Sequence, residues 1–143
     1  MTRRANILIR YASLSRRNRR LLRDAAVALG MASFAVAILP FRRAIQIGCV
    51  ALSKGQGQVG IDEVRWAVEA AAARSPWRTM CIEQGIAMQR LLRRSGIDAR
   101  LHYGARPGGS AGLQAHVWVT VDDAIVIGAA DAPGFAELAT FPQ

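Results

Sequence analysis

The spacing of apolar residues changes once along the chain, close to Gly96. Before this glycine, apolar residues recur at the three- and four-residue spacing of amphipathic helices. After it, apolar and polar residues alternate, as they do in a half-buried strand. The sequence therefore predicts a helical N-terminal half and an α+β fold, in which an antiparallel sheet packs on helices.

Capping residues, prolines and glycines set the ends of the predicted helices. Ser15 or Ser13 is suited to cap the first helix, which Pro40 stops or kinks. Thr79 is suited to cap the last helix, so that Cys81 would be its second residue. The predicted helices cover residues 15–39, 41–53, 62–73 and 80–95.

Strands are predicted in the C-terminal half, over residues 97–104, 115–121 and 124–128. The second and third are joined by Asp122-Asp123, which is suited to a two-residue hairpin turn. In that register His116 would lie opposite Ala129, and Gly128 would face away from it.

The chain of 143 residues carries a formal net charge of +9, and its basic residues crowd the N-terminal part. Such a cluster can bind nucleic acid, anionic lipid or an acidic protein, and a solvated helix face is the alternative. Aromatic residues do not alternate with these arginines, so we expect no nucleic-acid partner. Residues 25–41 carry no charge, which fits a buried or partner-facing helix or a peripheral association with membrane.

The sequence contains two cysteines, Cys49 and Cys81, which form no disulfide framework and fit a reducing, cytoplasmic compartment. No signal peptide is expected, because the Arg-rich stretch lies far from the N-terminus and no cleavage site follows it. The histidines, His102 and His116, lack metal-ligand spacing, so no metal and no cofactor are expected. Cys49 is predicted to be a packing residue.

Cys81 is the candidate nucleophile, because the N-terminus of a helix favours a thiolate over a thiol. A histidine on a neighbouring strand can take the proton of the thiol and later protonate a leaving amine. The amide N–H of Cys81, at an open helix end, can stabilise an oxyanion. Spacing alone leaves a second interpretation open, in which Cys81 is a small buried apolar residue.

Two segments, "CIEQGIAMQRLLRRSGIDARLHYGARP" and "LQAHVWVTVDDAIVIG", resemble a known family. They are similar to the transglutaminase-like cysteine peptidases that remove leader peptides in bacterial lasso-peptide biosynthesis. Cys81 begins a helix that ends in a Leu-Leu-Arg-Arg-x-Gly run, and Ala115-His116 and Trp118 occupy the family's Ala-His and Trp positions. The resemblance implies a transglutaminase/papain-like core over residues 61–143, preceded by a helical lead-in over residues 1–60, within one domain.

The resemblance also implies the chemistry and the partners. Cys81 would be the nucleophile and His116 the general base and acid in leader removal, with an acyl-enzyme intermediate. The chain resembles the stand-alone form of the family, so a separate protein would recognise the leader peptide of the precursor, and an ATP-dependent cyclase would act next. Two alternatives stay open: a non-catalytic peptide-binding module with a degenerate site, and a basic protein associated with membrane or nucleic acid.

The third catalytic residue is where the sequence departs from the family. The family's usual aspartate position, about twelve residues after His116, is Gly128. In the predicted register, Asp131 is a diagonal neighbour of His116 and would hold its tautomer. The alternative is that Asp131 caps a short helical turn that begins at Pro133.

Overall fold

The computed structural model of the chain describes residues 10–54, 59–130 and 132–143. Helices come first and the sheet follows, as predicted. The helices are α2 (Arg16–Ile38), α3 (Phe41–Ile45), α4 (Ile61–Arg74) and α5 (Cys81–Arg94). The strands are β1 (Ala99–Pro107), β2 (Leu113–Val121), β3 (Ala124–Ile127) and β4 (Ala136–Phe141), with short 3₁₀ turns at Gly109–Ala111 and Ala132–Gly134.

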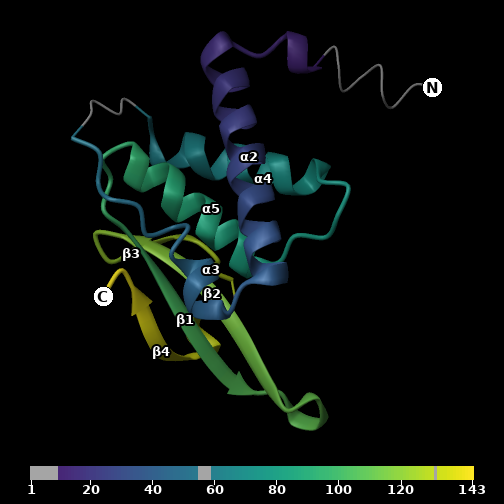
Figure 1. The fold of residues 1–143 in the computed structure, drawn as a ribbon, viewed down its shortest axis with the longest axis vertical. Helices are drawn as coiled ribbons and strands as arrows, with labels where there is room; N and C mark the ends of the chain where they lie inside the picture. Colours follow the sequence, from purple (N-terminus) through teal and green to yellow (C-terminus); the bar gives the residue numbers. More distant parts are fainter. Residues whose placement is uncertain (1–9, 55–58, 131) are drawn as a thin grey trace.

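Helix α5 is the central element of the fold. It contacts α2 and α4 as well as β1 and β2, so it forms a layer between the other helices and the sheet (Figure 1). The sheet is antiparallel with strand order β3-β2-β1-β4, and the tip of the β1–β2 hairpin projects beyond the helices (Figure 1). The predicted α+β fold, with helices in the N-terminal half, is confirmed.

The first helix follows the sequence prediction closely. The hydroxyl oxygen of Ser15 accepts a hydrogen bond from the backbone N–H of Asn18 at 3.1 Å, which caps α2 at its N-terminus. Pro40 follows the extended cap residue Leu39 and separates α2 from α3. One face of α2 enters the core through Leu21, Ala25, Ala28, Leu29, Ala32 and Ala35.

The predicted helix over residues 41–53 is wrong in length, because α3 ends at Ile45. Part of the backbone after it bonds to side chains of α5. Arg90 donates to the carbonyl of Ile47 at 3.0 Å, and Arg93 donates to the carbonyl of Val50 at 2.7 Å. These guanidinium groups satisfy carbonyls in an irregular segment, which explains why apolar spacing alone overestimated the helix.

The predicted start of the last helix is wrong by one residue. Met80, not Thr79, is the N-cap, and Cys81 is the first residue of α5. The carboxylate of Glu83 accepts the backbone N–H of Met80 at 2.9 Å. The cap therefore comes from an acidic side chain inside the first turn, a position that also complements the helix dipole.

The turn at Asp122-Asp123 is confirmed, because φ is 48° at Asp122 and 64° at Asp123. Positive φ at both central residues is what a tight two-residue hairpin requires. The register beyond the turn is not the predicted one. A bulge shifts the pairing of β2 with β3 between Val119 and Thr120, so that Val119 pairs with Ile127. Because one extra residue reverses the faces of all later positions, the predicted pairing of His116 with Ala129 is wrong.

Strand β4 was not predicted. It pairs with β1. Gln89 of α5 links both strands to the helix, because its buried amide donates to the carbonyl of Ala99 at 3.2 Å and to that of Phe141 at 2.7 Å. The sequence "AELATF" alternates only weakly between polar and apolar residues, which explains why the pattern gave no strand.

Candidate active site

Cys81 lies at the point where the helical layer meets the sheet. It is the first residue of α5, its side chain is partly buried, and it packs against the main hydrophobic core. Within the described residues, no group accepts a hydrogen bond from the backbone N–H of Cys81. The first N–H groups of a helix lack acceptors inside the helix, so this one is available to a ligand.

The next turn of α5 fixes how the helix sits on the sheet. Gly85 lies four residues after Cys81, and a Cβ atom there would come within 2.7 Å of Val117 Cγ1 and 3.4 Å of Leu101 Cδ1. The glycine therefore allows a close approach of α5 to β1 and β2. Val117 is consequently the residue of β2 that faces α5 next to His116.

His116 points to the other face of β2, since successive side chains of a strand alternate. It is buried, with 9% of its surface exposed, and its ring lies 5.1 Å from the ring of Phe135 and 6.1 Å from that of Trp118 between centroids. Its Nε2 lies 2.9 Å from the carbonyl oxygen of Gly128. A carbonyl only accepts, so Nε2 carries the proton and the Nδ1 atom of the neutral ring is left as an acceptor.

Gly128, at the position where the resemblance to leader peptidases implies an aspartate, supplies a backbone carbonyl to His116. Its φ is +83°, and a Cβ atom would lie 2.8 Å from the carbonyl oxygen of Val117 and 3.0 Å from Trp118 Cβ. The site thus requires glycine on two independent grounds, backbone conformation and space. The prediction that Gly128 is turned away from His116 is wrong, because the bulge in β3 brings its carbonyl to the imidazole.

The structure does not join the two predicted catalytic side chains directly. In the described part of the chain, no hydrogen bond links Cys81 to His116. The edge of β2 beside His116 has no β3 neighbour, because the pairing with β3 ends at Val119. Asp131, the predicted third residue, lies outside the described residues, and its role stays a prediction.

A second histidine cluster lies on the same face of the sheet as His116. His102 Nδ1 is 3.0 Å from Glu137 Oε2, its Nε2 is 2.8 Å from Thr120 Oγ1, and its ring stacks on Trp118. The hydroxyl of Thr140 also donates to Glu137, and this bond, followed by smaller effects of His102, lowers the pKa of the carboxyl group. His102 is therefore held by hydrogen bonds at both ring nitrogens.

Sequence reasoning missed the partners of His102. Glu137 and Thr140 come from β4, the strand that the pattern did not predict. The register of β1 with β2 places His102 opposite Trp118, which is buried.

A shallow hollow of about 370 Å³ borders the start of α5. Its walls come from the end of α4, the connecting loop and the first turns of α5: Glu69, Ala72, Ala73, Trp77, Arg78, Thr79 and Gln84. A peptide that approached the N-terminus of α5 would meet both charged and aromatic side chains here. Among residues 10–54, 59–130 and 132–143, no three His, Cys, Asp or Glu side chains are grouped to hold a metal ion.

A cysteine at the start of a helix that packs on an antiparallel sheet, with a histidine on that sheet, is typical of cysteine-type enzymes. The family model of the transglutaminase-like superfamily matches residues 2–140. This match spans nearly the whole chain, and the chain belongs to the transglutaminase-like superfamily. No curated protein and no solved structure gives a significant match.

Proposed function

We propose that this protein is a cytoplasmic cysteine peptidase that removes the leader from a ribosomally made lasso-peptide precursor. Membership of the transglutaminase-like superfamily supports a cysteine-type enzyme. The resemblance of residues 77–121 to leader peptidases supports the narrower role.

In the proposed reaction, the thiolate of Cys81 attacks the carbonyl carbon of the scissile peptide bond. The backbone N–H of Cys81 donates to the oxyanion of the tetrahedral intermediate. His116 takes the thiol proton and gives it to the leaving amine, which releases the core peptide and leaves the leader as a thioester. Water, deprotonated by His116, then hydrolyses the thioester and restores the thiol.

One observation carries this assignment for His116. Its Nε2–H donates to the carbonyl oxygen of Gly128 at 2.9 Å, which leaves Nδ1 with the free lone pair that a general base needs. In this proposal a backbone carbonyl takes over the orienting role that an aspartate has elsewhere. In this proposal the imidazole of His116, which points to the face of β2 opposite the residue that packs on α5, would have to turn toward Cys81 when the substrate binds.

The chemistry also implies partners. A separate recognition protein would deliver the leader peptide, and a cyclase that consumes ATP would use the amine freed by cleavage. In this proposal, the segment next to the scissile bond would lie in the hollow beside Thr79 and Gln84.

One alternative has an observation in its favour. Gly128 offers no carboxylate to His116, and no hydrogen bond joins Cys81 and His116 in the described residues. Both facts fit a non-catalytic module that binds peptides through a degenerate site. The two functions differ in the reactivity of one thiol, which can be measured directly.

We expect iodoacetamide to alkylate Cys81 at least about ten-fold faster than Cys49 near neutral pH, because the thiolate is the reactive form. Cys49 is the internal control, since burial raises the pKa of its thiol even though Arg93 lowers it in part. Peptide mapping by mass spectrometry over time gives both rates. Equal rates, or faster labelling of Cys49, would favour the non-catalytic module.

We expect weak cleavage of the precursor by this chain alone and a rise in kcat/KM of about 100-fold or more when the recognition protein is added. The reason is that tethering the leader raises the effective concentration of the scissile bond at the site. Initial rates with and without the partner measure the effect. A precursor that lacks the leader residues bound by the partner is the control, and it should show no gain. Identical kcat/KM values with and without the partner would contradict the delivery role.

A further inference from the structure

The outer face of α2 carries an apolar stripe that nothing in the described structure covers. Val27, Met31, Phe34 and Ile38 follow one another at four, three and four residues, so they share one side of the helix. Their exposed fractions are 57%, 40%, 67% and 59%. Four large apolar side chains on one helix face form a contiguous patch, whereas single exposed residues would need no explanation.

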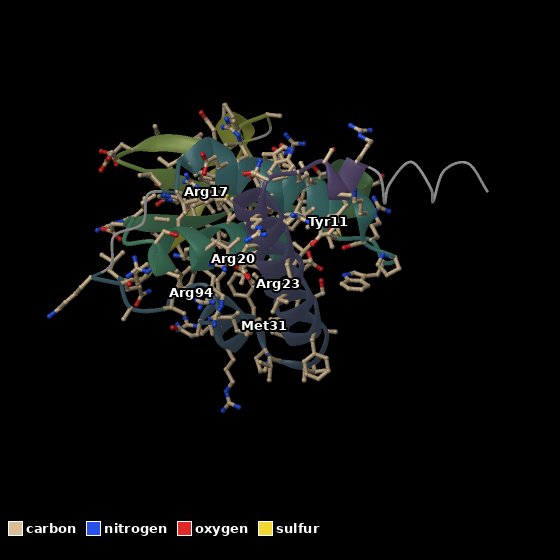
Figure 2. The ribbon with its side chains drawn as sticks, turned by 90° about the horizontal axis from the view of Figure 1, so that it is seen from above. Tyr11, Arg17, Arg20, Arg23, Met31 and Arg94 are labelled. Carbon is tan, nitrogen blue, oxygen red and sulfur yellow. The ribbon has the colours of Figure 1, made fainter. Side chains whose placement is uncertain are left out.

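The same face becomes basic toward the N-terminus of α2. The spacing that defines the stripe continues backwards from Val27 to Arg23, Arg20 and Arg16, which are all exposed. Figure 2 shows Arg20, Arg23 and Met31 in succession along the helix. Asp24 is the acidic residue beside them, and it already lies 3.8 Å from Arg23. One helix face therefore joins a cationic half to an apolar half.

We propose that this face of α2 binds the surface of an anionic lipid bilayer. Lipid phosphates would meet the arginines, and the apolar stripe would enter the boundary between headgroups and acyl chains. In an anionic bilayer, negatively charged headgroups lie directly beside hydrocarbon chains. This arrangement matches the arginine half and the apolar half of the α2 face. Helix α2 crosses in front of α4 and α5 in Figure 1. A helix that projects from the layer behind it can contact a flat bilayer surface along its length.

The neighbouring residues extend the same chemistry. Trp77, with 47% of its surface exposed, donates its indole N–H to the hydroxyl of Ser33 on α2 at 2.9 Å. Tryptophan is favoured at membrane interfaces because it combines an apolar ring with a polar N–H. Beyond the last turn of α2, Arg42 and Arg43 are exposed on α3. Cationic groups thus flank both ends of the stripe.

The helix would lie on the bilayer and not cross it. Among the described helices, α2 alone is long and apolar enough to span a membrane by length and composition. Its opposite face, however, holds Ala25, Leu29 and Ala32 at the centre of the core, with no exposed surface. Surrounding α2 with lipid would remove its contacts with α4 and α5, whereas binding through the outer face leaves them intact.

Co-sedimentation with lipid vesicles tests the proposal on the full chain. We expect binding to vesicles that contain phosphatidylglycerol, weaker binding to pure phosphatidylcholine, and a steep loss as salt is raised. The double variant Met31→Ser/Phe34→Ser should reduce the partition coefficient about ten-fold or more, because two apolar side chains no longer enter the interface. The variant Arg20→Glu/Arg23→Glu should abolish the preference for anionic lipid.

The matched control is Leu113→Ser/Leu138→Ser, which removes apolar side chains of similar exposure, 69% and 62%, from the sheet. This variant should bind vesicles as the wild type does. The proposal is overturned by absent binding to anionic vesicles at low salt, by equal binding to both lipids, or by equal loss in the control. It is also overturned if size-exclusion chromatography shows a dimer that Met31→Ser/Phe34→Ser dissociates, since a second copy would then cover the stripe. None of these readouts depends on peptide cleavage.

Discussion

Replacing Cys81 by alanine should abolish leader removal, with a loss of kcat of about 1000-fold or more, while the protein stays folded. In the proposed mechanism, the described part of the chain offers no other thiol at the N-terminus of a helix, and the other cysteine, Cys49, lies near Gln89 and the carbonyl of Ile45. A loss of this size is expected when a covalent nucleophile is removed. Mass spectrometry of the precursor after incubation with the variant and the recognition protein gives the rate.

Cys49→Ala is the matched control for this experiment. It removes a thiol that is also partly buried but lies beside Gln89, farther along α5. It should leave kcat within about two-fold of the wild type. Circular dichroism of both variants checks that the fold is kept. Cleavage by Cys81→Ala at the wild-type rate would remove Cys81 from the mechanism, and with it the proposed peptidase.

The second large effect is expected at Gly128, where alanine must adopt a φ of +83°. This left-handed conformation costs a residue with a Cβ atom about 1–2 kcal/mol. The methyl group must also displace Val117 or Trp118, and such overpacking costs about 1–3 kcal/mol. We therefore expect Gly128→Ala to lower the free energy of unfolding by about 2–5 kcal/mol in total.

The same substitution should also affect catalysis, because the carbonyl that holds His116 moves with the backbone of residue 128. We expect kcat to fall further than the loss of folded protein explains. Urea denaturation measures the change in stability, and cleavage rates under folding conditions measure the change in kcat.

Gly109→Ala separates the two causes of the instability. Gly109 also has a positive φ, +61°, but a Cβ atom there would meet nothing within 4 Å. This variant should lose only the backbone contribution of about 1–2 kcal/mol, and its cleavage rate should not change. If Gly128→Ala is no less stable than Gly109→Ala, the crowding around Val117 and Trp118 is not what selects glycine in the site.

The sequence predicted the parts of the fold that local signals determine. The cap at Ser15, the stop at Pro40 and the turn at Asp122-Asp123 each depend on residues within a few positions, and the structure confirms all three. The α+β class followed from the single change of period near Gly96. These features could be predicted because short-range backbone preferences and apolar spacing agree there.

What could not be predicted depends on contacts that are distant in the chain. The helix after Pro40 is short, and Arg90 and Arg93 bind the backbone that follows it from α5. The position of the Gly128 carbonyl depends on a bulge, and a one-residue shift reverses the faces of a strand. Cys81 and His116 were identifiable as residue types in a pattern, but the group bonded to His116 Nε2 is a backbone carbonyl, which has no signature in the sequence.

The place of α5 between two layers has a consequence for how the chain folds. Its core residues touch α2 and α4 on one side and the sheet on the other, and most of the buried apolar residues belong to one cluster. Arg93 adds a polar link, because it bonds to Val50, to Asp98 at 2.6 Å and to the carbonyl of Ala99. We therefore expect α2, α4, α5 and the sheet to unfold together, because none of them can bury its apolar surface without the others. Unfolding of α2 would then also expose the start of α5 at Cys81.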